Sequence, residues 1–170
     1  DRLIEIGRGA STDELLAKHL DIINRLFSGA EKEAAGEECK EIFKEIEKRP
    51  EPIEAFGELL STKILARKLA CEGYKTKWID SRDIIVKGNI GRTYQNIAQA
   101  TADKDVQVFV APGFIASDED GKVTTLGRGG SDYSAALYAA GSHAEKRADD
   151  QKNSQNRISL FHRDTSVRIF

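Results

Sequence analysis

The sequence predicts an α/β fold whose sheet is mainly parallel. Its clearest strand pattern is the apolar run at residues 106–111, which a Pro-Gly pair ends. Further strand patterns cover residues 75–79 and 84–86. Helix patterns lie before, between and after these strands. Strands that alternate with helices favour a parallel sheet with helices packed on its faces.

The helix patterns begin close to the N-terminus. Ser11 and Glu14 fit a capping box, in which each side chain accepts from the backbone amide of the other. A helix is expected to follow and to end at Gly29, because glycine commonly ends helices. Its apolar residues recur at helical spacing and are Leu15, Leu16, Leu20, Ile23, Leu26 and Phe27. Further helices are expected over residues 31–48, 53–72 and 94–101, and from Ser131 or Asp132 onward.

Length and composition limit the possible classes of protein. The chain has 170 residues, enough for one domain with a core, and is 39% hydrophobic and 32% charged. A net charge of −2 gives no general reason to expect nucleic acid or an anionic membrane as a partner. No apolar run reaches the length of a membrane span, and the first residues lack a signal-peptide pattern. Two cysteines and three scattered histidines make no metal-ligand spacing, and a reducing cytoplasm is the expected location.

Two features lead us to expect either a fragment or a sequence from which modified residues or loops are left out. It does not begin with methionine and contains none. Its character also changes after residue 140, where residues 144–156 are polar without an apolar period. We therefore expect residues 1–140 to form one unit and residues 141–170 to form a tail, joined across a segment missing from the sequence. Residues 158–161 and 167–170 have strand patterns that fit a terminal hairpin.

Residues 124–134 carry the strongest functional signal. Three glycines flank Arg128, and Ser131 and Asp132 follow directly before an apolar helix pattern. Glycines let backbone amides approach a ligand closely, and the positive end of the helix faces the same loop. Arg128 adds a planar cation suited to a carboxylate or a phosphate. The run predicts a site for a small anion; the alternative is a surface loop with an exposed arginine.

Three segments together resemble the aspartate kinases. Residues 113–117 followed by TTLGRGGSDY at 124–133 closely resemble a motif of that family. Upstream, FGELLS at 56–61 resembles the family's (F/Y)GE-L-S helix, and WIDSR at 78–82 resembles its W-x-D-x-R segment. The three occur in the family's order, and the resemblance covers about residues 1–140.

The resemblance implies a three-layer α/β/α sandwich of the amino-acid kinase type, here incomplete. It implies transfer of the γ-phosphate of ATP, with Mg²⁺, to the side-chain carboxylate of L-aspartate. The product, 4-phospho-L-aspartate, starts the route to lysine, threonine and methionine. L-aspartate and ATP are therefore the expected partners, and the intact enzyme is expected to be a cytoplasmic homo-oligomer.

The resemblance also implies roles for individual residues. Arg128 would pair with a substrate carboxylate, and Glu58 would hold the α-amino group. Asp132 would be the catalytic residue, close to the transferred phosphoryl group. The aspartate pocket would further be lined by Phe114, Gly129, Gly130 and Ser131. The chemistry agrees, because a selective pocket for aspartate needs both a cation and a carboxylate, and phosphoryl transfer needs positioning and charge neutralisation.

The sequence departs from the family in the parts that handle phosphate. The family's K-F-G-G-(T/S)-S motif, whose lysine neutralises phosphate charge, and its W-T-D-V-x-G segment, which contacts ATP, do not occur. The regulatory ACT domains are not recognisable. We therefore expect this chain alone to be inactive. The alternatives are a non-catalytic aspartate-binding or regulatory module, and an amino-acid kinase with another acceptor, against which the GRGGSD run argues.

Overall fold

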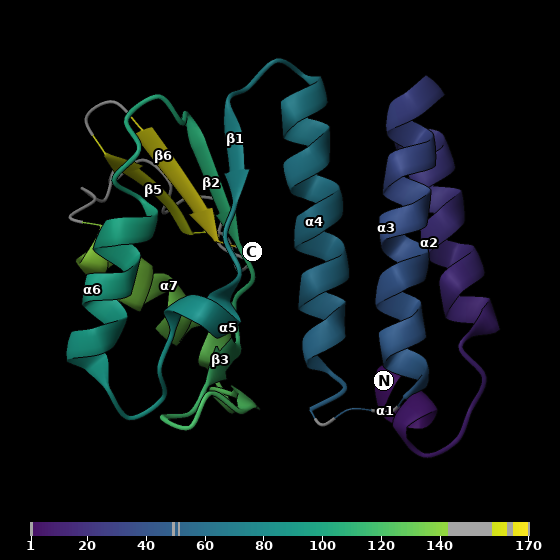
Figure 1. Ribbon diagram of the computed structural model, residues 1–170, viewed down its shortest axis with the longest axis horizontal. Coiled ribbons are helices and arrows are strands. Elements are labelled where there is room, and N and C mark those ends of the chain that lie inside the picture. Colours follow the sequence, from purple (N-terminus) through teal and green to yellow (C-terminus); the bar gives the residue numbers. More distant parts are fainter. Residues whose placement is uncertain (1, 49, 51, 143–157, 163–164, 170) are drawn as a thin grey trace.

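The computed structural model describes residues 2–48, 50, 52–142, 158–162 and 165–169 (Figure 1). Residues 143–157, which include the polar stretch 144–156, lie outside the described residues. The elements are α1 (Arg2–Gly7), α2 (Asp13–Leu26), α3 (Gly29–Glu47), α4 (Ala55–Cys71), β1 (Thr76–Trp78), α5 (Ser81–Ile84), α6 (Ile90–Ala100), β2 (Val108–Ala111), β3 (Ile115–Ser117), β4 (Val123–Thr125), α7 (Gly130–Gly141), β5 (Ile158–His162) and β6 (Thr165–Ile169).

The main sheet has the strand order β1-β2-β6-β5. β1 and β6 both pair with β2 in parallel, as the alternation of strands and helices predicts. β5 pairs with β6 antiparallel, which confirms the terminal hairpin. The proposed division at residue 140 stays a prediction.

Helices cover both faces of this sheet, with α4 on one side and α6 and α7 on the other (Figure 1). The central strand β2 shows the reason, because all four of its residues are buried and they alternate between the two faces. Val108 and Val110 pack with Ala66 of α4. Phe109 and Ala111 belong to the cluster formed with α6 and α7. The three layers of the predicted α/β/α sandwich are therefore present.

The first four helices form a second core next to the sheet. The helices α2 and α3 lie beyond α4, on its far side from the sheet (Figure 1). Ile23 of α2, Phe43 of α3 and Leu60 of α4 are buried in one cluster. Ile115 of β3 joins the same cluster, which ties the helices to the loop region after β2. Among the described residues, no helix combines the length and apolar character needed to cross a bilayer.

The start of α2 differs from the prediction. The N-cap is Thr12, whose side chain makes no capping hydrogen bond. Ser11 Oγ instead accepts from the Asp13 amide at 3.1 Å and donates to the Asp13 carboxylate at 2.7 Å. Glu14 forms an ion pair with Arg2. The capping box is wrong because α2 begins one residue later than it requires, with Thr12 and not Ser11 as the N-cap.

Two further boundaries also differ. Gly29, expected to end α2, opens α3 with a φ of 56°, after α2 has ended at Leu26. The extended segment expected at residues 84–86 begins one residue later, because Ile84 is the last residue of the short helix α5, which Asp80 caps by accepting from the Arg82 amide at 3.0 Å. Ile85 is extended, and its carbonyl accepts from the Ser117 amide at 2.9 Å. Of that apolar run, Val86 makes a single parallel bridge, to Ser117.

Candidate functional site

Phe114 follows β2 in a rare backbone conformation. Its φ is 67°, and among the described residues it is the one non-glycine with a positive φ. The Ile115 amide donates to the Gly113 carbonyl at 2.8 Å, which closes a three-residue γ-turn around Phe114. A residue held in such a conformation costs about 1–3 kcal/mol, and strain of this kind concentrates at functional sites.

The glycine-rich loop packs directly against this turn. The Leu126 amide donates to the Phe114 carbonyl at 2.8 Å. Gly127 and Gly129 have φ values of 73° and 75°, a region that favours glycine. A Cβ atom on Gly130 would lie 2.9 Å from both Leu126 Cβ and Phe114 Cδ2, so a side chain would not fit without displacing them. The glycines are therefore required by the path of the loop and by its contact with Phe114.

The helix α7 begins one or two residues earlier than predicted. Gly129 is its N-cap and Gly130 its first residue, which places Ser131 and Asp132 within the first turn. Asp132 is therefore not an N-cap. The Gly130 amide donates to Gly127, but the amides of Ser131 and Asp132 have no acceptor among the described residues. Two free amides at the positive end of a helix suit an anion.

Arg128, Ser131 and Asp132 are all exposed on this loop and first turn. In the described part of the chain, the Arg128 guanidinium has no ion pair or hydrogen bond, and neither does the Asp132 carboxylate. A cation, a hydroxyl and a carboxylate therefore lie close together in the sequence, within residues 128–132, and all three are free to contact a ligand.

Glu58 lies in the first turn of α4. Its carboxylate is half-buried, and burial raises its pKa above the ordinary value. The described residues give that carboxylate no hydrogen-bond or ion-pair partner. The neighbouring Leu59 is buried in the cluster that contains Ile115 and against which Phe114 packs. The core therefore joins the start of α4 to the γ-turn, while Glu58 and Arg128 form no ion pair with each other.

Residues 3–147 match the model of the amino acid kinase family. The chain belongs to that family. Over 99 residues it is 35% identical to the lysine-sensitive aspartokinase 3 of Escherichia coli, a match that covers 53% of this chain and 22% of that enzyme. Over 93 residues it is 33% identical to the bifunctional aspartokinase/homoserine dehydrogenase of Daucus carota, covering 49% of this chain and 10% of the relative.

Solved structures of aspartokinases share the fold. Escherichia coli aspartokinase III in complex with lysine and aspartate superposes with a TM-score of 0.65 at 25% identity, covering 85% of this chain and 38% of that one. The aspartate kinase of Clostridium acetobutylicum gives a TM-score of 0.65 at 23% identity, covering 85% and 33%. The amino-acid kinase fold is thus confirmed. The chain spans only a tenth to two fifths of the length of these relatives.

The third motif of this amino-acid kinase chain, WIDSR at residues 78–82, makes contacts that hold the fold together. Arg82 Nη2 pairs with Asp80 Oδ2 at 2.6 Å, beside the cap that Asp80 provides. The Trp78 indole donates to the Thr62 hydroxyl at 3.0 Å, and the Lys63 ammonium lies 4.1 Å from the centre of the indole ring. These contacts join β1 to the middle of α4.

A buried polar network behind the γ-turn was not predicted from the sequence. Ser81 Oγ donates to the Pro112 carbonyl at 2.5 Å and lies 2.9 Å from the Tyr138 hydroxyl. Burial raises the pKa of Tyr138, so its hydroxyl remains protonated as a donor. Ser134 Oγ lies 3.2 Å from the Phe114 amide. The signal in the sequence was that Ser134 and Tyr138 are polar residues within an apolar helix pattern, directly after the GRGGSD run.

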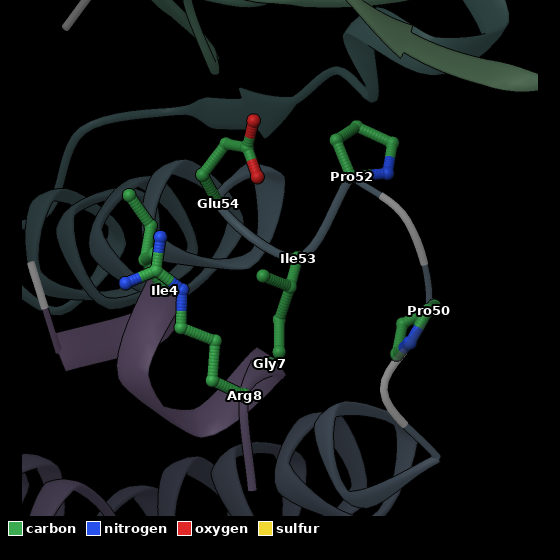
Figure 2. A pocket seen from close by; sticks show the side chains of 7 residues that line it. All are labelled: Ile4, Gly7, Arg8, Pro50, Pro52, Ile53 and Glu54. Carbon is green, nitrogen blue, oxygen red and sulfur yellow. The ribbon is translucent and has the colours of Figure 1, made fainter. Parts of the chain in front are cut away.

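A surface cavity of about 390 Å³ lies elsewhere, between α1 and the segment that leads into α4 (Figure 2). It is lined by Ile4, Gly7, Arg8, Pro50, Pro52, Ile53 and Glu54. None of the predicted site residues lines it. In the described part of the chain, no three His, Cys, Asp or Glu side chains gather to hold a metal ion.

Proposed function

We propose that this chain is the aspartate-binding part of an aspartate kinase. The parent enzyme would transfer the γ-phosphate of ATP to the side-chain carboxylate of L-aspartate and form 4-phospho-L-aspartate. The support is the family membership, the aspartokinase relatives and the geometry around Phe114. Because the chain spans 22% of its bacterial relative, the reaction is proposed for the whole enzyme and the substrate pocket for this chain.

The observation that carries the proposal is a pair of unpartnered charges, Arg128 in the loop before α7 and Glu58 in the first turn of α4. Arg128 offers a free guanidinium, and Glu58 a half-buried carboxylate. L-aspartate has one ammonium and two carboxylates. Its ammonium can pair with Glu58 and one carboxylate with Arg128, and the second carboxylate then remains free to react. Burial without a partner disfavours the ionised form of Glu58, and a bound ammonium would reverse this.

The remaining residues would then take positions around the reacting carboxylate. Gly129, Gly130 and Ser131 would line the pocket with backbone, and the free amides of Ser131 and Asp132 fit the oxygen atoms of an anion. Asp132 would be the catalytic residue, next to the transferred phosphoryl group. ATP would supply that group when bound, and Mg²⁺ would neutralise part of its charge. Phosphoryl transfer depends mainly on positioning and charge stabilisation, which a fixed loop at a helix end can provide.

The same assignment has consequences for the cell. The product would start the route to lysine, threonine and methionine. The intact enzyme would act in the cytoplasm as a homo-oligomer and would use ATP with Mg²⁺ as its cofactors.

Calorimetric titration of the 170-residue chain with L-aspartate tests the pocket. We expect Arg128→Ala to abolish measurable binding, whereas Lys122→Ala should bind like the wild type. Lys122 is the matched control because it is an exposed cation on the turn between β3 and β4. L-glutamate and L-asparagine should bind more weakly than L-aspartate. Equal loss in both variants, or tighter binding of another amino acid, would contradict the assignment.

A second measurement separates binding from chemistry. The sequence does not contain the lysine motif with which the family neutralises phosphate charge. We therefore expect the chain alone to form no aspartyl phosphate when it is incubated with Mg-ATP and L-aspartate, with hydroxylamine as the trap. Hydroxamate formed above the level of the Arg128→Ala variant would show that these 170 residues are catalytically sufficient.

A further inference from the structure

Ser134 joins two parts of the proposed pocket through a single hydroxyl. Its Oγ accepts a hydrogen bond of 3.2 Å from the Phe114 amide and donates one of 2.8 Å to the Ser131 carbonyl. The residue is fully buried, with a relative exposure of 0%. The oxygen therefore bridges the γ-turn after β2 and the first turn of α7, which are separated by the whole β3–β4 hairpin.

The bridge acts on the most constrained residue of the loop region. Phe114 has a positive φ, and Ser134 Oγ is the acceptor that the structure gives its amide. If this acceptor is removed, the amide is left without a partner and the turn loses the bond that holds it to α7. The Phe114 ring would then be free to shift relative to Gly130, with which it is in close contact.

We propose that Ser134 is a positioning residue of the amino-acid site, which keeps the Phe114 turn at a fixed spacing from the first turn of α7. This rests on the function proposed above. Ser134 is buried behind the loop, so it acts through Phe114 and Ser131 and not on the substrate itself. Its effect should fall on affinity and on the discrimination between amino acids of different length, because both depend on that spacing.

Ser142 supplies a matched control on the same helix. It is also a buried serine, and its Oγ donates to the Tyr138 carbonyl at 2.6 Å. That bond lies within the last turn of α7 and joins no second segment. Ser134→Ala and Ser142→Ala therefore each remove a serine bond to a helix carbonyl, but only Ser134→Ala removes the bond to Phe114.

Two measurements on the full 170-residue chain test the role. Hydrogen exchange of the Phe114 amide, followed by NMR, should be protected in the wild type and in Ser142→Ala but at least about tenfold faster in Ser134→Ala. In calorimetric titration, Ser134→Ala should bind L-aspartate at least about tenfold more weakly and should lose preference for L-aspartate over L-glutamate. Ser134→Thr, which keeps a hydroxyl, should restore both properties.

The outcomes distinguish this proposal from the function on which it rests. A wild-type chain that does not bind L-aspartate overturns the proposed function and this role with it. If the wild type binds but Ser134→Ala keeps its affinity and its selectivity, the positioning role alone is wrong. It is also wrong if Ser142→Ala loses as much affinity as Ser134→Ala, if Ser134→Thr behaves like Ser134→Ala, or if the Phe114 amide stays protected in Ser134→Ala.

Discussion

The hydroxyl groups of Ser81 and Tyr138 lie 2.9 Å apart in a fully buried site. Ser81 donates its proton to the Pro112 carbonyl, so Tyr138 is the donor in the bond between the two hydroxyls. This chain of bonds links α5, the end of β2 and α7, directly before the turn at Phe114. These bonds hold the backbone at Pro112, two residues before Phe114 of the proposed pocket.

Tyr138→Phe and Ser81→Ala should therefore differ in cost. Tyr138→Phe removes a donor and leaves the Ser81–Pro112 bond intact, so we expect a loss of about 1 kcal/mol in the free energy of unfolding. Ser81→Ala leaves both the Tyr138 hydroxyl and the Pro112 carbonyl without their partner, so the loss should be about 2–3 kcal/mol. Urea unfolding measures both. The prediction fails if Tyr138→Phe is the more damaging change.

Glu58 should lower stability while it supports binding. Burial raises its pKa above the ordinary value of 4.5, so the folded protein holds this proton more tightly than the unfolded chain. The free energy of unfolding must then fall as the pH rises from about 4.5 through the raised pKa. Glu58→Gln removes this penalty. We expect a higher melting temperature at pH 7, together with loss of L-aspartate binding in calorimetry.

Glu38 is the control for that prediction, because its surroundings have the opposite effect. Burial by itself would raise its pKa, but hydrogen bonds and charge from Lys63 and Arg67 hold the pKa below the ordinary value. Its contribution to stability is present above the ordinary carboxyl range and is lost as the pH falls. Glu38→Gln should lower the melting temperature at pH 7 and leave binding unchanged. Equal shifts in the two variants would count against both assignments.

Gly130→Ala should destabilise the protein through a steric clash in the loop. The added Cβ would meet Phe114 Cδ2 and Leu126 Cβ at 2.9 Å, and overpacking of this kind costs about 1–3 kcal/mol. Gly91→Ala is the control, since its Cβ would meet only Asn89 Oδ1 at 4.0 Å. We expect thermal unfolding to show loss for Gly130→Ala and a gain of about 0.5–1 kcal/mol for Gly91→Ala. L-aspartate binding should weaken in the former alone.

Gly141 should be equally intolerant, at the contact between α6 and α7. Its Cβ would approach Ile97 Cβ to 2.8 Å, and Ile97 is fully buried, so we expect a loss of about 1–3 kcal/mol for Gly141→Ala. Gly36 in α3 has its nearest contact at 3.9 Å, to Leu20 Cδ2. Gly36→Ala should stabilise by about 0.5–1 kcal/mol. Urea unfolding that ranked the two variants in the opposite order would refute this packing.

The fold could be predicted where a pattern extends over several residues. The run at residues 106–111 contains β2, because burial on both faces demands apolar side chains throughout. The prediction failed where one local contact decides the outcome. Ile84 is apolar and β-branched, yet it belongs to α5, the helix that Asp80 caps, so the extended segment begins only at Ile85. The capping box at Ser11 failed because the Ser11 hydroxyl bonds to Asp13 and Thr12 is the N-cap instead.

The sequence predicts which residues would form the candidate site, and that prediction stays untested, but it does not predict the geometry of the loop. The sequence shows the glycines, Arg128 and the helix pattern in this order. The helix α7 begins within two residues of the expected position. The γ-turn at Phe114 has no local signal, because positive φ normally marks glycine and here an aromatic residue is held by Ser134 and the neighbouring loop. Whether Glu58 and Asp132 have the proposed roles stays a prediction.

The left-handed turn at Phe114 has a consequence for protein engineering. A glycine would adopt a φ of 67° without the steric penalty, so a search for stabilising substitutions would favour Phe114→Gly. The same change would remove the aromatic ring that rests beside Gly130. Thermostability alone is therefore a misleading target at this position, and variant libraries of this domain need selection for ligand retention alongside heat resistance.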